Sequence, residues 1–200
     1  PDGTCRLVAG LAAAGVRCLV RHHDPSWDDS SRPVDYRFPL NPDGSVHVAI
    51  SYAVADGLHA RCGIEAAVLF NSVPESVYSG GCRNRTRTQL GVAQNELLLL
   101  HPVSVYPRKN VAGAAELASQ FAKQHAKVVW WLTGAEVNPV PDVFVHRFIG
   151  GRCGSVADMY AAADVVLLPS LWEGWGNAVC EAAANGKPVI TGEWPALVDM

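Results

Sequence analysis

The stretch VVLLPSLWEGWGNAVCE, residues 165–181, places an apolar strand, a loop with two glycines and the start of a helix in direct succession. Val165 to Leu168 carries no polar side chain, which is typical of a strand in a parallel sheet that is covered on both faces. The helix is predicted to begin at Asn177 and to end before Gly186. Ligands of open parallel sheets bind at the carboxyl ends of the strands, so the loop between strand and helix is the expected binding site.

The same alternation of strands and helices extends along the chain in both directions. It predicts an α/β fold with parallel strands. We expect further strands at 16–20, 46–50, 66–70, 97–100, 128–132, 143–148 and 189–191, and helices ending at Ala14, spanning 51–61 and 110–123, and starting at Ser155.

Residues 74–94 interrupt this alternation with Pro, Ser, Gly, Asn and Arg, including the pair Gly80-Gly81. Clusters of these residues favour irregular connections. We interpret the segment as an interdomain linker between one domain at 1–73 and a second at 95–200. Residues 25–45, rich in Asp, Ser and Pro, are predicted to form a loop.

Composition excludes several classes of protein. With 18% charged residues and a formal net charge of −3, nothing indicates binding to nucleic acid. No apolar run approaches the roughly 18 to 20 residues that a membrane span needs.

The six cysteines form no C-x-x-C pair and have no histidine at zinc-finger spacing. We therefore predict free thiols in a reducing cytoplasm, with disulfides as the alternative. His47, His59, His125 and His146 show no partner spacing either, and we predict no metal site.

The glycine loop has the chemistry of a nucleotide-sugar site. A helix N-terminus offers unpaired N–H groups and partial positive charge to a diphosphate, and Gly174 and Gly176 let a ligand approach the backbone. Glu173 and Glu181 bracket the turn with carboxylates, which accept hydrogen bonds from sugar hydroxyls. The alternative interpretations are a helix-start acid for Glu181 and a solvated loop residue for Glu173.

The pattern S-x-x-E-G-W-G-x-x-x-x-E-A-x-A-x-G-K-P-V-I, residues 170–190, resembles the donor-site signature of retaining GT-B glycosyltransferases of family 4. The resemblance implies that the first Glu and the backbone amides after it hold the donor sugar, and that the second Glu holds the ribose hydroxyls. Carried to this sequence, the donor-binding residues of this loop are Glu173, Gly174, Trp175, Gly176, Asn177 and Glu181.

A second similarity to this family lies in HPVSVYPRKN, residues 101–110. The family usually places an Arg soon after the strand and a Lys just before the helix, and both neutralise the donor diphosphate. Lys109 matches the Lys, but the Arg position falls near Val103 or Ser104, which cannot serve. Either Arg108 substitutes or the site is impaired. The alternative is that Arg108 and Lys109 form a solvated helix start.

The remaining candidate site residues lie outside these two motifs. A strand ending in His22-His23-Asp24 resembles the acceptor-side loop of the family, in which a His contacts the donor sugar. His23 is the first choice and His22 the second, and a surface or capping His pair is the alternative. Gly134 is expected to approach the nucleotide. Trp130 and Trp131 are predicted to be core residues.

The resemblance implies a GT-B fold, with parts of two Rossmann-like domains facing a cleft. Residues 1–73 would be the C-terminal part of the acceptor-side domain and residues 95–200 the N-terminal part of the donor domain. Complete enzymes of this type have more strands before residue 1 and after Met200, so we expect the chain to be a fragment of such an enzyme.

The implied reaction moves a sugar from a nucleoside-diphosphate sugar to an acceptor hydroxyl, with retention of anomeric configuration. Glu173, His23 and Lys109 are the candidate catalytic residues. The resemblance implies no metal or cofactor beyond the donor itself. The acceptor is an unspecified glycan, lipid or small molecule, and peripheral membrane contact stays open. A non-catalytic nucleotide-sugar-binding remnant and a nucleotide-sugar epimerase are the alternatives.

Overall fold

The computed structural model describes residues 2–23, 45–134 and 145–200, which form two compact units. The first unit comprises Pro1–Asn71, Trp172–Gly176 and Trp194–Met200. The second unit comprises Ser72–Leu171 and Asn177–Glu193. Two short pieces of the C-terminal half therefore belong with the N-terminal part of the chain.

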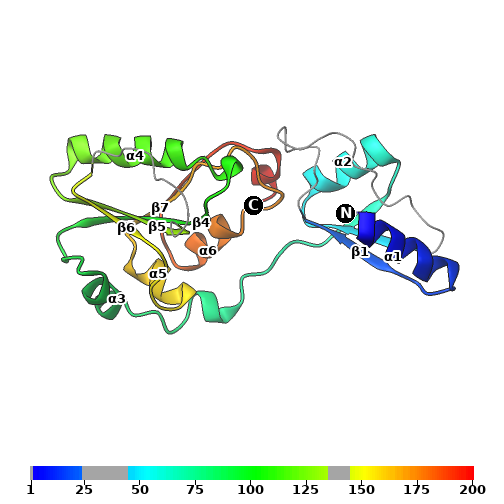
Figure 1. The fold of residues 1–200 in the computed structure, drawn as a ribbon, viewed down its shortest axis with the longest axis horizontal. Coiled ribbons are helices and arrows are strands. Elements are labelled where there is room, and N and C mark those ends of the chain that lie inside the picture. Colours follow the sequence, from blue (N-terminus) through cyan, green and yellow to red (C-terminus); the bar gives the residue numbers. More distant parts are fainter. Residues whose placement is uncertain (1, 24–44, 135–144) are drawn as a thin grey trace. The chain divides into compact units, whose positions relative to one another are not determined.

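The first unit is built on a three-stranded parallel sheet in the order β1-β2-β3. Between β2 and β3 runs the helix α2, a crossover that parallel neighbours require (Figure 1). The elements are α1 (Asp2–Ala13), β1 (Leu19–His22), β2 (Val46–Ala49), α2 (Tyr52–Cys62), β3 (Ala66–Val68) and the 3-10 helix η4 (Pro195–Asp199).

Hydrogen bonds to side chains set the start of α2, and a glycine sets its end. The Ser51 side chain accepts from the backbone N–H of Val54 at 3.2 Å, and the Asp199 carboxylate accepts from the N–H of Tyr52 at 2.8 Å. These bonds satisfy N–H groups that a helix start leaves without partners. Gly63, at φ 64°, ends the helix in the left-handed conformation. The predicted helix at 51–61 is confirmed.

The second unit is a five-stranded parallel sheet in the order β6-β5-β4-β7-β8. Helix α4 covers one face, and α3 and α5 lie on the other (Figure 1). Trp130 and Trp131 have no exposed surface, which confirms them as core residues. The elements are η2 (Glu75–Val77), α3 (Arg83–Leu90), β4 (Leu97–Ser104), η3 (Pro107–Lys109), α4 (Val111–Gln124), β5 (Val128–Gly134), β6 (Arg147–Gly150), α5 (Val156–Ala162), β7 (Val165–Leu168), α6 (Asn177–Ala184) and β8 (Val189–Thr191).

Strand boundaries differ from the predicted ones wherever the paired residues and the apolar run do not coincide. β4 continues to Ser104, with an irregular register against β5 between His101 and Ser104. β1 starts three residues later than expected, at Leu19. The strand expected at 143–148 begins at Arg147, and its first two residues lie outside the described ranges. An apolar run in the sequence indicates which residues are buried, whereas the bounds of a strand depend on which residues hydrogen-bond to a neighbouring strand.

Helix α3 lies inside the segment that we interpreted as a linker, and the segment belongs to the second unit. Its sequence, RNRTRTQL, has no apolar stripe, so periodicity could not reveal it. Hydrogen bonds from arginine side chains of α3 attach this helix to the end of α5. Arg83 and Arg87 both donate to the carbonyl oxygen of Ala162, at 2.9 and 3.0 Å. This carbonyl closes α5, where helices leave acceptors unpaired and favour cations.

The assignment of Trp172–Gly176 and Trp194–Met200 to the first unit also differs from the domain predicted at 95–200. The Trp175 indole stacks on Phe70 with ring centroids 4.9 Å apart. Gly176 adopts φ 90°, and a Cβ there would lie 2.9 Å from the Trp194 indole. Aromatic packing and a glycine-only conformation thus explain why these segments leave the second unit.

Candidate functional site

The turn before α4 is tied to the end of β7. Asn110, at φ 50°, accepts from the N–H of Gly113 through its side-chain oxygen at 3.1 Å. Its side-chain amide donates to the carbonyl of Pro169 at 3.0 Å. The N–H of Leu171 donates to the carbonyl of Arg108 at 2.8 Å. Asn110 is therefore the N-cap of the helix predicted at 110–123, and it also joins the carboxyl ends of the adjacent strands β4 and β7.

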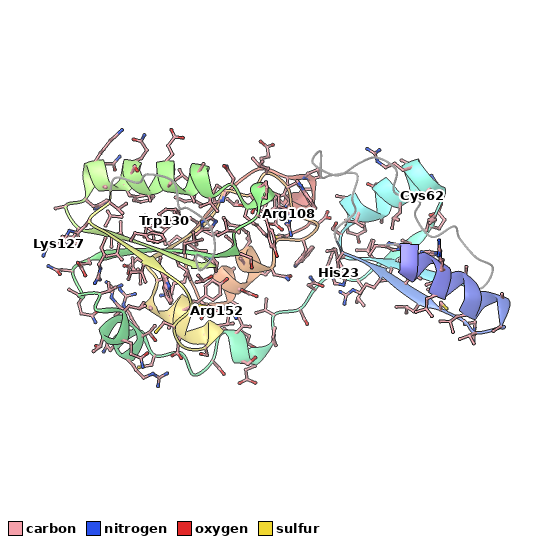
Figure 2. The ribbon with its side chains drawn as sticks, in the orientation of Figure 1. His23, Cys62, Arg108, Lys127, Trp130 and Arg152 are labelled. Atoms are coloured by element: carbon pink, nitrogen blue, oxygen red, sulfur yellow. The ribbon has the colours of Figure 1, made fainter. Side chains whose placement is uncertain are left out.

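This turn concentrates positive charge at a helix start. Arg108 and Lys109 are both half-buried, and the first turn of α4 carries no acidic residue. Figure 2 shows Arg108 at the opposite end of the unit from Lys127. Because α4 has 14 residues, its N-terminal dipole adds to the two cations. The arrangement is suited to an anion at the carboxyl edge of the sheet.

The position where the family places an Arg is apolar or uncharged here, as the sequence indicated. Val103 is buried and Ser104 is exposed. His101, two residues earlier, has no exposed surface. Burial first, and then the charge of Lys109, lower the pKa of His101 to about 3, so this imidazole is neutral near pH 7. Arg108 and Lys109 are thus the cations that this turn itself supplies.

Glu181 lies in α6 and is half-buried. The hydroxyl of Tyr160, on α5, donates to its Oε2 at 2.6 Å. Burial first, and then the Glu181 charge, raise the pKa of Tyr160, which keeps the phenol protonated. Glu181 therefore has a specific partner, unlike a solvated helix-start acid. Sequence reasoning missed Tyr160, because a tyrosine among the alanines of a short helix looks like core packing.

The loop before α6 belongs to the first unit. Glu173 is buried, with 8% of its surface exposed, so the interpretation as a solvated loop residue is wrong. Gly174, Trp175 and Gly176 are buried with it, and Asn177, the first residue of α6, is exposed. The loop is thus a packed segment that the chain joins directly to the start of α6.

The two histidine candidates after β1 have different surroundings. His22 Nε2 lies 3.0 Å from Nδ1 of His47, on the neighbouring strand. Burial first, and then His47 and His23, lower the pKa of His22 to about 4. His23 is exposed at the end of β1, and Asp24 lies outside the described residues. Parallel pairing of β1 and β2 brings these two histidines together, although His47 shows no metal-ligand spacing in the sequence.

Gly134 is explained by packing. A Cβ there would overlap the carbonyl oxygen of Val103, so the close approach of β4 and β5 requires a glycine. Approach to a nucleotide stays a prediction for this residue.

In the described ranges no group of three or more His, Cys, Asp or Glu side chains could hold a metal. The cysteines whose side chains are described carry free thiols; they are Cys18, Cys62, Cys82, Cys153 and Cys180.

The parallel sheets and the cationic turn at a helix start define an α/β protein of the Rossmann-like class. Residues 98–200 match the family described as Glycosyl transferases group 1. The chain belongs to this family, and its α/β fold with parallel sheets is the GT-B fold of its structural neighbours. Among the helices of the described residues, none is both long and apolar enough to cross a membrane.

Curated relatives are similar over most of this chain. Mannosylglucosylglycerate synthase of Thermotoga maritima is 23% identical over 92% of the chain and 53% of its own length. N-acetyl-alpha-D-glucosaminyl L-malate synthase of Bacillus anthracis is 23% identical over 88% of the chain and 47% of its own length. The chain therefore spans about half the length of the curated relatives it matches.

Solved structures show the same fold. HepE of Anabaena, in complex with UDP and glucose, matches 100% of this chain and 59% of its own with a TM-score of 0.74 and 21% identity. WaaG, a glycosyltransferase involved in lipopolysaccharide biosynthesis, matches 76% of this chain and 45% of its own with a TM-score of 0.61 and 22% identity.

Proposed function

We propose that the protein is a retaining glycosyltransferase of family 4, which moves a sugar from a nucleoside-diphosphate sugar to an acceptor hydroxyl. The observation that carries the proposal is the cationic turn of Arg108 and Lys109, fixed at the N-terminus of α4 by Asn110. Membership of the group 1 family and the UDP-bound and glucose-bound HepE neighbour support a nucleotide-sugar donor.

The diphosphate is assigned to this turn. Lys109 supplies a point charge, and Arg108 replaces the family Arg that Val103 and Ser104 do not provide. The N–H groups of the first turn of α4 add hydrogen-bond donors. Such fixed donors and charges stabilise a diphosphate most when it leaves, because its negative charge then increases. The proposal needs no metal or cofactor for this step.

The ribose is assigned to Glu181, with Asn177 and Gly134 as further donor-binding residues. The transferred sugar is assigned to Glu173 and to the backbone amides of Gly174, Trp175 and Gly176. His23 is proposed as a contact of the donor sugar. Together, Glu173, His23 and Lys109 are the proposed catalytic residues. Retention of configuration rests on the resemblance of residues 170–190 to the family signature.

The second candidate is a non-catalytic nucleotide-sugar-binding protein. Val103 and Ser104 favour it, since the position of the family Arg carries no charge. For either candidate we propose a cytoplasmic location. The acceptor of an active enzyme would be a glycan, a lipid or a small molecule.

A thermal-shift screen with UDP-, GDP- and ADP-sugars tests the proposal. A ligand that binds only the folded state raises the unfolding midpoint, so selective stabilisation identifies the donor. Assays of the stabilising donor with sugar, lipid and small-molecule acceptors follow. In the full-length protein, transfer with retained configuration supports the enzyme, and stabilisation without transfer supports the binding protein. Failure of all nucleotide sugars to stabilise the protein would overturn both.

A further inference from the structure

We propose that Tyr160 is a positioning residue for the nucleotide ribose. Its hydroxyl holds one oxygen of the Glu181 carboxylate, which leaves the other oxygen for the ribose hydroxyls. The inference rests on the proposed function, because it takes Glu181 as the ribose ligand. It assigns to Tyr160, on a different helix, a role in selecting ribonucleotides.

The geometry is that of a strong hydrogen bond. The distance from the Tyr160 hydroxyl to Glu181 Oε2 is 2.6 Å, within the range for a hydroxyl that donates to a carboxylate. Tyr160 has no exposed surface and belongs to the core cluster of the second unit, together with Met159, Val166 and Ala182. Close packing fixes the ring, so the hydroxyl is a rigid anchor for a side chain with several rotatable bonds.

The backbone of Glu181 is fixed as well. The side-chain amide of Asn185 donates to the carbonyl of Glu181 at 2.8 Å and to the carbonyl of Val77 at 3.1 Å. These bonds join α6 to the segment before α3. With backbone and Oε2 both held, the remaining carboxylate oxygen has a defined position. A ligand then binds without the loss of side-chain rotamer freedom that a mobile glutamate would suffer.

The direction of the hydrogen bond determines what Glu181 offers to a ligand. An ionised carboxylate only accepts, so the Tyr160 hydroxyl must donate. Burial and the Glu181 charge raise the pKa of Tyr160, so the donor persists across the physiological pH range. Glu181 thus presents acceptor positions alone, which fit the paired hydroxyls of a ribose. A 2′-deoxyribose leaves one acceptor position unused, so the arrangement selects for ribonucleotides.

The test compares Tyr160→Phe with the unchanged protein by isothermal titration calorimetry. The probes are UDP, GDP and ADP and their 2′-deoxy counterparts. We expect Tyr160→Phe to weaken binding of the best ribonucleotide roughly tenfold to 150-fold, the range for a hydrogen bond to a charged group. Binding of the deoxy counterpart should change far less, so the ratio between the two affinities falls. Tyr78→Phe removes a hydroxyl from an exposed ring in the same unit and should leave the ratio unchanged.

A double-mutant cycle completes the test. In a Glu181→Ala background, Tyr160→Phe should have no further effect on nucleotide affinity, because the two residues act as one unit. If the unchanged protein binds no nucleotide, the proposed function fails. If it binds and Tyr160→Phe keeps the affinity ratio, or weakens ribo and deoxy forms equally, the positioning role is wrong. A Tyr160→Phe protein that does not fold would also contradict it, since the hydroxyl would then serve the fold.

Discussion

Arg87 has no exposed surface, and its Nη1 lies 3.1 Å from Oδ2 of Asp164. The same guanidinium donates to the carbonyls of Ala162, Ala93 and Glu96. We expect Arg87→Leu to lower the free energy of unfolding by about 3 to 5 kcal/mol, because it leaves buried acceptors without a donor. Urea denaturation measures this. Arg152→Leu, at an exposed position, is the control, and equal effects of the two variants would contradict the assigned role of Arg87.

Glu181→Ala should weaken binding of UDP, or of whichever nucleoside diphosphate binds best, by about 1 to 3 kcal/mol. The physical reason is that the ribose hydroxyls and Tyr160 both lose their acceptor. Calorimetric titration of the folded variant gives the affinity. Glu116→Ala, at an exposed position on α4, serves as the matched control. Unchanged affinity in Glu181→Ala would exclude the ribose role.

Lys109→Ala should weaken UDP binding by roughly tenfold or more and leave uridine binding unchanged, because the lysine acts on the diphosphate. Titration with both ligands at two salt concentrations checks this, and the loss for UDP should be larger at low salt. Lys127→Ala removes an exposed lysine at the opposite end of the unit and should have little effect (Figure 2). An equal loss for uridine and UDP would show that Lys109 does not act on phosphate.

Glu173→Gln should reduce turnover more than nucleotide affinity, since its proposed partner is the transferred sugar and not the nucleotide. Steady-state kinetics with the donor found by thermal shift, and titration with the matching nucleoside diphosphate, separate the two effects. A variant with normal turnover would remove Glu173 from the catalytic residues.

The pKa of His22 falls from its ordinary 6.5 to about 4 in the folded protein. The unfolded chain therefore binds more protons between these two values, so folding stability decreases as the pH falls from about 6.5 to about 4. The loss from His22 is up to about 3 kcal/mol. His101 and His47 are shifted in the same direction and add to it.

Urea denaturation at pH 7 and at pH 4.5 isolates the share of His22. Because His22→Gln removes the titrating group, the variant should lose less stability than the unchanged protein between the two pH values. His125→Gln, at an exposed position, is the control and should follow the unchanged protein. Identical pH dependence of His22→Gln and the unchanged protein would show that burial does not depress this pKa.

The parts of the fold that the sequence predicted are those encoded in short contiguous stretches. The apolar runs at 165–168 and 189–191 coincide with β7 and β8. The helix predicted to start at Ser155 is α5, and its N-terminus is a capping box in which the side chains of Ser155 and Asp158 each accept from the other residue's backbone N–H. Capping side chains act within one helical turn, so their signal survives in the sequence alone. The candidate donor residues at 173–181 also come from one contiguous stretch of sequence, and their roles stay predictions.

Other features depend on partners far apart in the chain, and only the tertiary structure decided them. Helix α3 has no apolar stripe and is held by the carbonyls that close α5, about 75 residues later. Tyr160 contacts Glu181 from another helix, and His22 contacts His47 from the neighbouring strand, because packing within each unit brings distant segments together. Residues near each other in sequence limit which local conformations are possible. Which distant side chain completes a buried hydrogen bond is settled only when the elements pack, since burial without a partner is costly.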